Sequence, residues 1–239
     1  MKYLLADCET TGFNEPEVVE VAYFEFSEDI TQLSRQYYKR FKPSKPIELG
    51  ATATHHIFES DLQDCEPSST FVLPTCEALI GHNIDYDWAA FGKPDVKRIC
   101  TLALARHLLP ELPTHTQIAL AYHFFGTAIR ETIRNAHNAL EDIKVCAMIL
   151  PELIKLWNIK YADKQITCMS ELYAASEIAR VPLKLTFGKH RGKTYEQVMA
   201  EDAGYFIWWK TKSDTKPDEY ELKAIEDARL AYMGRNNAN

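Results

Sequence analysis

The chain has little that would mark it as a membrane, disulfide-bonded or zinc-binding protein. Its 239 residues contain no apolar run near the roughly 20 residues that a spanning helix needs. Asp7 interrupts the N-terminal apolar segment before the core of a signal peptide could form. The six cysteines lie far apart without a C-x-x-C pair, which argues against a zinc cage or a small disulfide scaffold. We therefore expect a soluble, cytoplasmic protein with reduced thiols.

The chain also has no excess of basic residues. The formal net charge of −7 argues against tight, indiscriminate binding of nucleic acid. Residues 184–216 nevertheless carry seven basic and four acidic side chains. If a polyanion binds outside a catalytic site, we expect it to bind to this segment. The chain length allows one large and one small unit. We expect a main domain over residues 1–165, a connector over 166–182 and a small module over 183–239.

Strand patterns come first along the chain, and strands alternate with helices later. β-branched and aromatic residues predict strands over residues 2–7, 18–26, 35–42, 77–82 and 96–100. Helical patterns begin near residue 85 and cover residues 102–109 and 115–125. Consecutive early strands favour antiparallel pairs, and the later alternation favours parallel additions to the same sheet. The fold class is therefore α/β, with a mixed sheet flanked by helices.

Two carboxylates follow the first predicted strand. Alternate side chains of a strand share a face, so Asp7 and Glu9 should project together while Cys8 points into the packing. A solvated turn is the ordinary explanation of such a pair, but these two end what reads as a central strand, where their repulsion needs compensation. A divalent cation would supply it, and carboxylate oxygens suit Mg²⁺ or Mn²⁺.

A second acidic segment, His82-Asn83-Ile84-Asp85-Tyr86-Asp87, follows a buried strand and opens a helix. A carboxylate in a first helical turn could equally serve to satisfy the helix dipole. His82 and Asn83 could fix the loop by hydrogen bonds. The spacing alone does not choose between Asp85 and Asp87.

A third segment pairs a histidine with an aspartate. His137 and Asp142 are five residues apart, or roughly 140° around a helix, so they do not face one site from helical positions. We expect Asn138 to cap a helix that reaches about Trp157, with Asp142 facing inward and His137 on the loop before it. An imidazole, with a usual pKa of about 6.5, suits a general base. Four carboxylates and one imidazole suffice for two-metal phosphodiester hydrolysis.

These three segments, in this order, resemble the exonuclease motifs of the DEDDh superfamily. The resemblance covers about residues 1–160 and implies an RNase H-like mixed five-stranded sheet and 3′→5′ hydrolysis. It favours Asp87 over Asp85. It implies two Mg²⁺ ions, replaceable by Mn²⁺, with Asp7 as the bridging ligand and His137 as the general base. The implied metal ligands are Asp7, Glu9, Asp87 and Asp142.

The resemblance also implies a substrate surface and a substrate. The implied substrate-binding residues are Thr10, Thr11, Gly12, Phe13, His82 and Asn83, with Phe13 where this superfamily often packs a side chain against the 3′-terminal base. Residues 98–106 and the tail segments 186–193 and 202–208 are similar to the exodeoxyribonuclease X family. That likeness implies release of 5′-mononucleotides from the 3′ ends of single-stranded and duplex DNA, and a place in DNA repair.

The tail module has two features of its own. Its segment 187–193 places two glycines around cations, which would let backbone and side chains approach phosphates. Of Trp208 and Trp209, we expect one in the core of the module and one at its surface. These residues fit a second DNA contact that supplements the active site. They fit a purely structural or protein-docking role equally well.

Two other functions stay open at the level of the sequence. The same ligands could serve a 3′→5′ exoribonuclease, and parallel assays on matched DNA and RNA would separate the two. The chain could also be a non-catalytic nucleic-acid-binding or partner-binding module, which would bind without metal-stimulated release of product. Fold likeness alone does not decide between these, because function depends on the site. The oligomeric state is not indicated.

Overall fold

The computed structural model describes residues 2–28, 33–135 and 138–237, so the expectation for His137 lies outside the described residues. The chain divides into two compact units, Met1–Ser176 and Glu177–Asn239. The α6 helix, Met169–Arg180, occupies most of the expected connector and runs across this division. The domain boundaries expected from the sequence stay a prediction.

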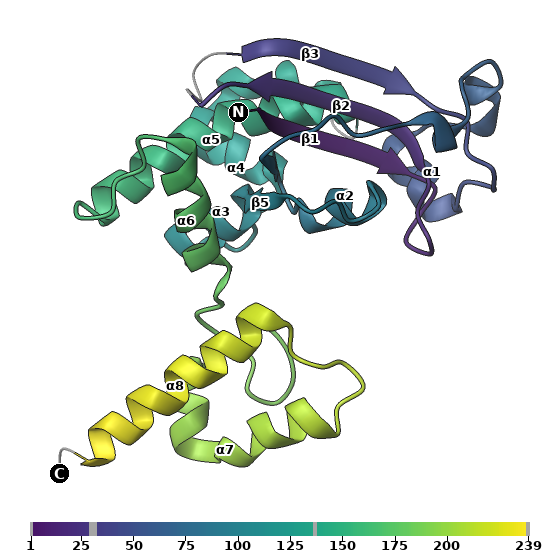
Figure 1. Ribbon diagram of the computed structural model, residues 1–239. Coiled ribbons are helices and arrows are strands. Elements are labelled where there is room, and N and C mark those ends of the chain that lie inside the picture. The colour runs from purple at the N-terminus through teal and green to yellow at the C-terminus, as the bar shows by residue number, and fades with distance from the viewer. Residues whose placement is uncertain (1, 29–32, 136–137, 238–239) are drawn as a thin grey trace. The chain divides into compact units, whose positions relative to one another are not determined.

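The first unit is built on a mixed sheet of five strands in the order β3-β2-β1-β4-β5 (Figure 1). The strands are β1 (Tyr3–Thr10), β2 (Val18–Phe26), β3 (Leu33–Arg40), β4 (Ala78–Gly81) and β5 (Lys97–Cys100). The first three pair antiparallel, whereas β4 runs parallel to β1 and β5 runs parallel to β4. The expected mixed five-stranded α/β fold is confirmed.

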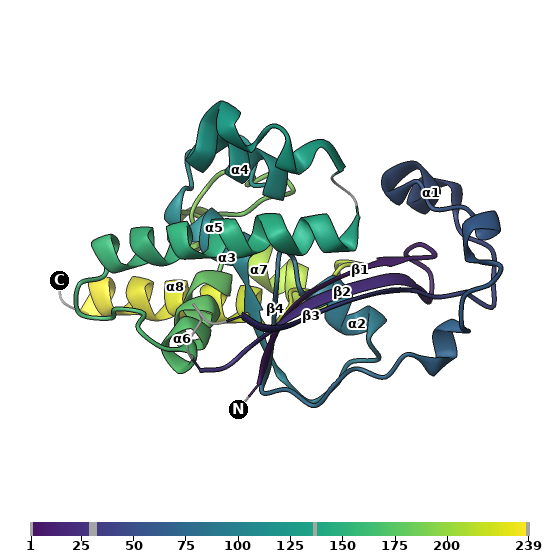
Figure 2. The same ribbon diagram turned by 90° about the horizontal axis from the view of Figure 1, so that it is seen from above.

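Helices surround this sheet and form the second unit. They are α1 (Leu49–His55), α2 (Asp85–Ala90), α3 (Thr101–Leu108), α4 (Gln117–Phe125), α5 (Ala139–Lys160), α6, α7 (Tyr195–Thr211) and α8 (Glu219–Asn237). Figure 2 shows α5 alongside the strands with α4 on its outer side. Among the described residues, no helix has both the length and the apolar character needed to cross a membrane.

The central strands and α5 form the core beneath the acidic residues. Every residue of β2 is buried, and α5 buries a stripe that includes Ile143, Leu150 and Leu153. These positions recur at helical spacing and lie on one face. Asn138 caps α5 by accepting a hydrogen bond from the Glu141 amide at 3.4 Å, and the helix continues to Lys160, three residues beyond the expected end. The core therefore fixes the direction of the helix that carries Asp142.

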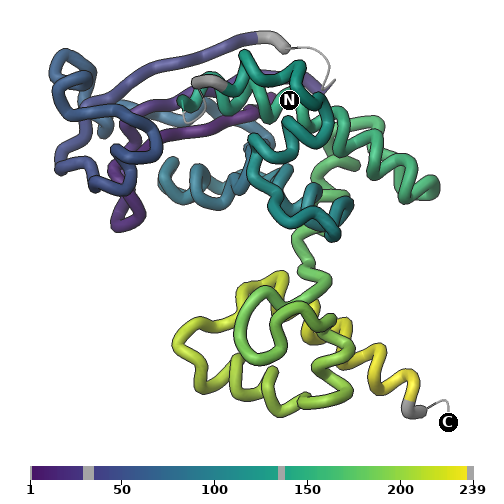
Figure 3. Tube along the Cα trace, turned by 180° about the vertical axis from the view of Figure 1, so that it is seen from behind, coloured from purple at the N-terminus to yellow at the C-terminus, as the bar shows by residue number. Residues whose placement is uncertain are grey.

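In the second unit α7 and α8 lie side by side (Figure 3), and an apolar core fills the space between them. Trp209 is buried in it and Trp208 is 45% exposed, which confirms that one tryptophan is core and the other surface. Asp202 has non-helical backbone angles and interrupts α7. Each unit thus has a separate apolar cluster.

Candidate active site

Three carboxylates converge at the end of β1. Asp7 and Glu9 are partly exposed on one face of β1, while Cys8 between them is buried, as the strand alternation predicts. Asp142 reaches the same place from the first turn of α5. One ligand oxygen from each of Asp7, Glu9 and Asp142 lies within 4.8 Å of the other two. Segments more than 130 positions apart in the sequence therefore meet in one acidic cluster.

The structure separates the two aspartates of the second motif. Asp87 is buried at 4% exposure and accepts a hydrogen bond of 2.9 Å from the Cys8 amide, which places it beside β1. Asp85 instead forms an ion pair of 2.5 Å with Arg98. Asn83 is exposed and has a backbone φ of +71°, a conformation that asparagine tolerates well, so it shapes the turn that delivers Asp87.

The carboxylates raise one another's affinity for protons. Desolvation, followed by the charges of Asp87 and Asp142, raises the pKa of Asp7 well above its ordinary value. Desolvation and the Asp142 charge raise the pKa of Glu9 to about 8, and desolvation raises that of Asp87 to about 7. Concentrated negative charge of this kind is stable at neutral pH only with protons or cations.

This donor set fits a divalent metal. All its members are carboxylates, the oxygen ligands that Mg²⁺, Mn²⁺ and Ca²⁺ prefer, and three of them come within 4.8 Å. The raised pKa values of Asp7, Glu9 and Asp87 mean that an added positive charge would relieve a real electrostatic cost. The cluster is therefore chemically suited to the metal that the sequence predicts.

Glu20 is a positioning residue that the sequence reading did not identify. Its side chain is fully buried in β2, opposite Glu9 in the sheet. One oxygen accepts from the Arg40 guanidinium and the Tyr38 hydroxyl, both at 2.7 Å, and the other accepts from the Ala139 amide at 2.9 Å. A carboxylate at a helix N-terminus stabilises it, so Glu20 anchors the start of α5. A glutamate within an otherwise apolar strand was the signal, although Glu25 on the same strand gives the same one.

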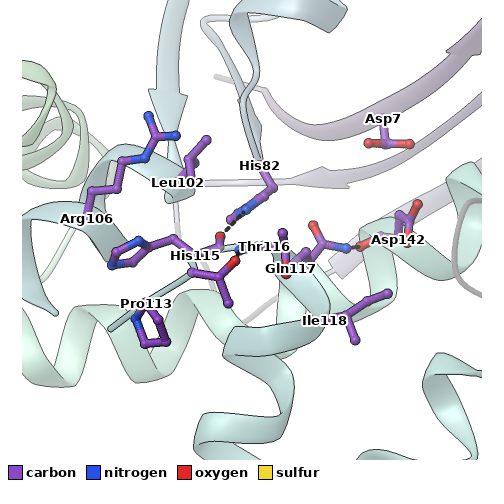
Figure 4. A pocket seen from close by; sticks show the side chains of 11 residues that line it. Asp7, His82, Leu102, Arg106, Pro113, His115, Thr116, Gln117, Ile118 and Asp142 are labelled. Atoms are coloured by element: carbon purple, nitrogen blue, oxygen red, sulfur yellow. Dashed lines mark hydrogen bonds between the residues drawn. The ribbon is translucent and has the colours of Figure 1, made fainter. Parts of the chain in front are cut away.

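A cavity of about 530 Å³ opens beside the cluster (Figure 4). Asp7 and Asp142 lie at one end and Arg106 at the other, with His82 between them. Gln117 donates a hydrogen bond of 2.7 Å to the backbone oxygen of Asp142, which ties α4 to α5 at this point. Arg106 is exposed and forms no ion pair with a carboxylate of the described residues.

His82 holds the wall of this cavity. Its Nε2 lies 2.9 Å from the His115 carbonyl oxygen, which only accepts, so Nε2 carries the proton and Nδ1 accepts from the Thr101 hydroxyl at 3.0 Å. Burial lowers the pKa of His82 to about 4, so the ring is neutral near pH 7. The expected role of His82 in substrate binding stays a prediction, and its bonds position the loop before α4.

The turn after β1 mixes buried and exposed residues. Thr10 and Thr11 are buried, and the Thr11 hydroxyl accepts from the Glu17 amide at 3.1 Å. Gly12 has a φ of +141°, a backbone conformation that residues with a side chain rarely adopt, so glycine is favoured there. Phe13 is 86% exposed, with its ring centroid 5.7 Å from that of Tyr86. Of the predicted substrate residues on this turn, Phe13 presents the most open surface.

Known proteins similar to this chain are exonucleases. Residues 4–150 match the exonuclease family of the RNase T type. Exodeoxyribonuclease 10 of Escherichia coli K12 is 24% identical over 223 residues, which cover 91% of this chain and 94% of that protein. The protein of that name from E. coli O6:H1 matches equally.

Solved structures show the same fold. Exonuclease X in complex with 5′ overhanging duplex DNA aligns with a TM-score of 0.54 and 20% identity, over 73% of this chain and 99% of that one. The zinc-bound E. coli ExoI–ssDNA complex aligns with a TM-score of 0.51 and 17% identity, over 68% of this chain and 41% of that one.

Proposed function

The chain belongs to the RNase T exonuclease family, and on this premise we propose that it is a metal-dependent 3′→5′ exodeoxyribonuclease that releases 5′-mononucleotides from DNA ends. The observation that carries the proposal is the cluster of Asp7, Glu9 and Asp142, with ligand oxygens within 4.8 Å and the buried Asp87 beside it. Without a bound cation, the repulsion between these carboxylates has to be relieved by protons, so a divalent metal would stabilise the cluster at neutral pH.

In this proposal Asp7, Glu9, Asp87 and Asp142 would hold two cations, Mg²⁺ or Mn²⁺. When bound, such ions offset phosphate charge and stabilise the attacking and leaving oxygens of an in-line displacement. His137 takes the proton of the attacking water, a role assigned from its place in the third motif. Glu20 and Gln117 keep Asp142 in place through the start of α5.

The exposed residues around the cluster bind the strand. The Phe13 ring, 86% exposed next to Tyr86, stacks on the terminal base. The Arg106 guanidinium, at the far end of the cavity from Asp7, contacts a backbone phosphate. DNA is favoured as the substrate because the relative that aligns with nearly the whole chain is named an exodeoxyribonuclease. A cytoplasmic place in DNA repair completes the proposal.

The direct test is product analysis with single-site variants. Purified protein is incubated with 5′-labelled single-stranded DNA, duplex DNA and matched RNA, in Mg²⁺, Mn²⁺ or chelator. We expect stepwise shortening from the 3′ end with the metals, none with chelator, and a loss of about 100-fold or more in rate for Asp7→Asn and Asp142→Asn.

Asp85→Asn is the matched control, since Asp85 pairs with Arg98 rather than joining the cluster, and it should retain activity. Faster shortening of RNA than of DNA would replace the deoxyribonuclease assignment with an exoribonuclease. Binding without metal-stimulated release would leave a non-catalytic nucleic-acid-binding module. Retained turnover in Asp7→Asn would refute the assignment of the site.

A further inference from the structure

The second unit, residues 177–239, contains a cavity of its own. It measures about 550 Å³ and is lined mainly by Phe187, Gly188, Lys189, Tyr205 and Trp208. This volume lies within the range of roughly 300–1,000 Å³ that small-molecule and cofactor sites occupy. The lining combines aromatic rings with the ion pair of Lys189 and Asp202, a composition that differs from that of the acidic cluster.

An aromatic face is open in this cavity. Trp208 is 45% exposed, and its ring centroid lies 5.5 Å from that of the buried Tyr205. Its neighbour Trp209 already fills the core and donates a hydrogen bond of 3.0 Å to the Thr215 carbonyl oxygen. Trp208 is therefore a large flat ring at the surface that the core of the unit does not need.

The turn around Gly188, which forms one wall of the cavity, is fixed by its contacts with α7. Gly188 has a φ of +67°, and a Cβ there would lie 2.5 Å from the Tyr205 hydroxyl, so only glycine lets the turn approach that ring. Asp202, where α7 is interrupted, accepts from Lys189 at 2.7 Å and from His190 at 3.0 Å. These bonds join the turn to α7 and keep the cavity open between them.

The segment that forms this cavity is rich in basic residues. Residues 184–216 carry seven basic and four acidic side chains, in a chain whose net charge is −7. Five exposed cations of this segment form no ion pair with the described carboxylates, namely Lys184, Arg191, Lys210, Lys212 and Lys216. A polyanion would therefore be attracted to this segment more than to the rest of the surface.

We propose that this cavity binds single-stranded nucleic acid, with an unpaired base stacked on Trp208 and the neighbouring phosphates held by the exposed, unpaired cations of residues 184–216. Stacking on an exposed aromatic ring next to cations is how single strands are bound without sequence preference. The inference rests on the proposed function, since the substrate there is a nucleic-acid strand. It adds a second contact, outside the carboxylate cluster.

The test uses the full chain in chelator, where no hydrolysis occurs, and a fluorescently labelled single-stranded 20-mer of DNA. Fluorescence anisotropy gives the dissociation constant. We expect Trp208→Ala to weaken binding by about 5- to 100-fold, the range that the loss of one stacked base produces. Trp208→Phe, which keeps an aromatic face, should bind within about threefold of the unchanged protein.

Ile207→Ala is the matched control, because Ile207 is 66% exposed on the same helix and does not line the cavity. It should bind as the unchanged protein does, and thermal melts establish that all variants are folded. A blunt duplex should show no dependence on Trp208, since its bases are already stacked. A single-stranded RNA 20-mer should show the same dependence, because every base offers a ring face.

Two results would overturn the inference: Trp208→Ala binding as tightly as the unchanged protein, or Ile207→Ala weakening binding to the same extent. Nuclease assays on the same preparations separate this failure from that of the proposed function. Normal metal-dependent hydrolysis with no Trp208 dependence refutes only the second contact. Absence of hydrolysis with Trp208-dependent binding refutes only the nuclease assignment.

Discussion

The carboxyl groups of the acidic cluster repel one another, and this repulsion makes the stability of the fold depend on pH. The pKa of Glu9 is raised to about 8 and that of Asp87 to about 7, by desolvation and by nearby carboxylates. Carboxyl groups whose pKa is raised by folding bind protons more tightly in the folded state than in the unfolded one. Their contribution therefore favours folding at low pH and turns against it as the pH rises.

The direction of this pH dependence can be tested by comparing metal-free protein with protein to which metal is added. The contribution is fully present below the unfolded pKa near 4 and is lost as the pH rises through about 7 to 8. Mg²⁺ or Mn²⁺ binds only the folded state and should therefore raise the melting temperature. We expect the rise to be about 4 °C or more at pH 8 and smaller at pH 5. Equal increases at both pH values would contradict it.

Glu9→Gln is the corresponding variant. Removing one charge from the cluster should raise the melting temperature of the metal-free protein at pH 8 by about 2–4 °C and reduce the increase that Mg²⁺ gives. The control is Glu152→Gln on the distal half of α5, which pairs with Lys155 away from the cluster and should leave the Mg²⁺ effect unchanged. Both are followed by differential scanning fluorimetry.

Arg106 offers a test of strand binding at the residue scale. Its exposed guanidinium lines the end of the cavity farthest from Asp7 and Asp142, so Arg106→Gln should lower kcat/KM on DNA by about 3- to 10-fold, mainly through KM. Losing one phosphate contact should also reduce the salt dependence of binding by about one unit of slope. Lys155→Gln, at an exposed ion pair on α5, should change neither quantity.

At the scale of elements, the start of α5 is held from two sides. Glu20 on β2 accepts from the Ala139 amide, and Gln117 on α4 donates to the Asp142 carbonyl oxygen. Asn138 adds a cap whose 3.4 Å distance makes it a weak one. The helix that carries Asp142 therefore depends on a strand and on a neighbouring helix for its position.

Glu20→Ala should separate this anchoring from ordinary packing. It leaves the Ala139 amide and the Tyr38 hydroxyl without their acceptor, which should cost about 1–3 kcal/mol of unfolding free energy in urea titrations. It should also lower kcat while KM changes little, because Asp142 moves and the exposed strand-binding residues do not. Arg40→Gln, which keeps the Glu20 carboxylate, should retain kcat; an equal loss would refute the anchoring.

At the scale of the whole molecule, two compact units carry separate apolar cores and different charge. The first unit contains the acidic cluster, whereas the core of the second is built around Trp209 between α7 and α8. Separate cores permit separate unfolding. The two units should therefore respond differently to a defect placed in one of them.

Trp209→Ala tests this independence. Removing a buried tryptophan should cost about 3–5 kcal/mol within residues 177–239. Hydrogen exchange followed by mass spectrometry should then show lost protection across those residues and unchanged protection in β1, β2 and α5. Loss of protection throughout the chain would instead indicate one cooperative unit. Trp208→Ala, at an exposed position, should leave both patterns as they were.

The sequence by itself determined the succession of strands and helices along the chain, the alternation that exposes Asp7 and Glu9 around Cys8, and the cap at Asn138. These follow from local periodicity and short-range hydrogen bonding, which the chain carries wherever it folds. Tertiary structure alone decided that Asp87 is buried beside the cluster while Asp85 pairs with Arg98, and that Glu20 holds α5. Those outcomes depend on contacts between distant segments, and such contacts form only once the sheet brings β1, β2 and α5 together.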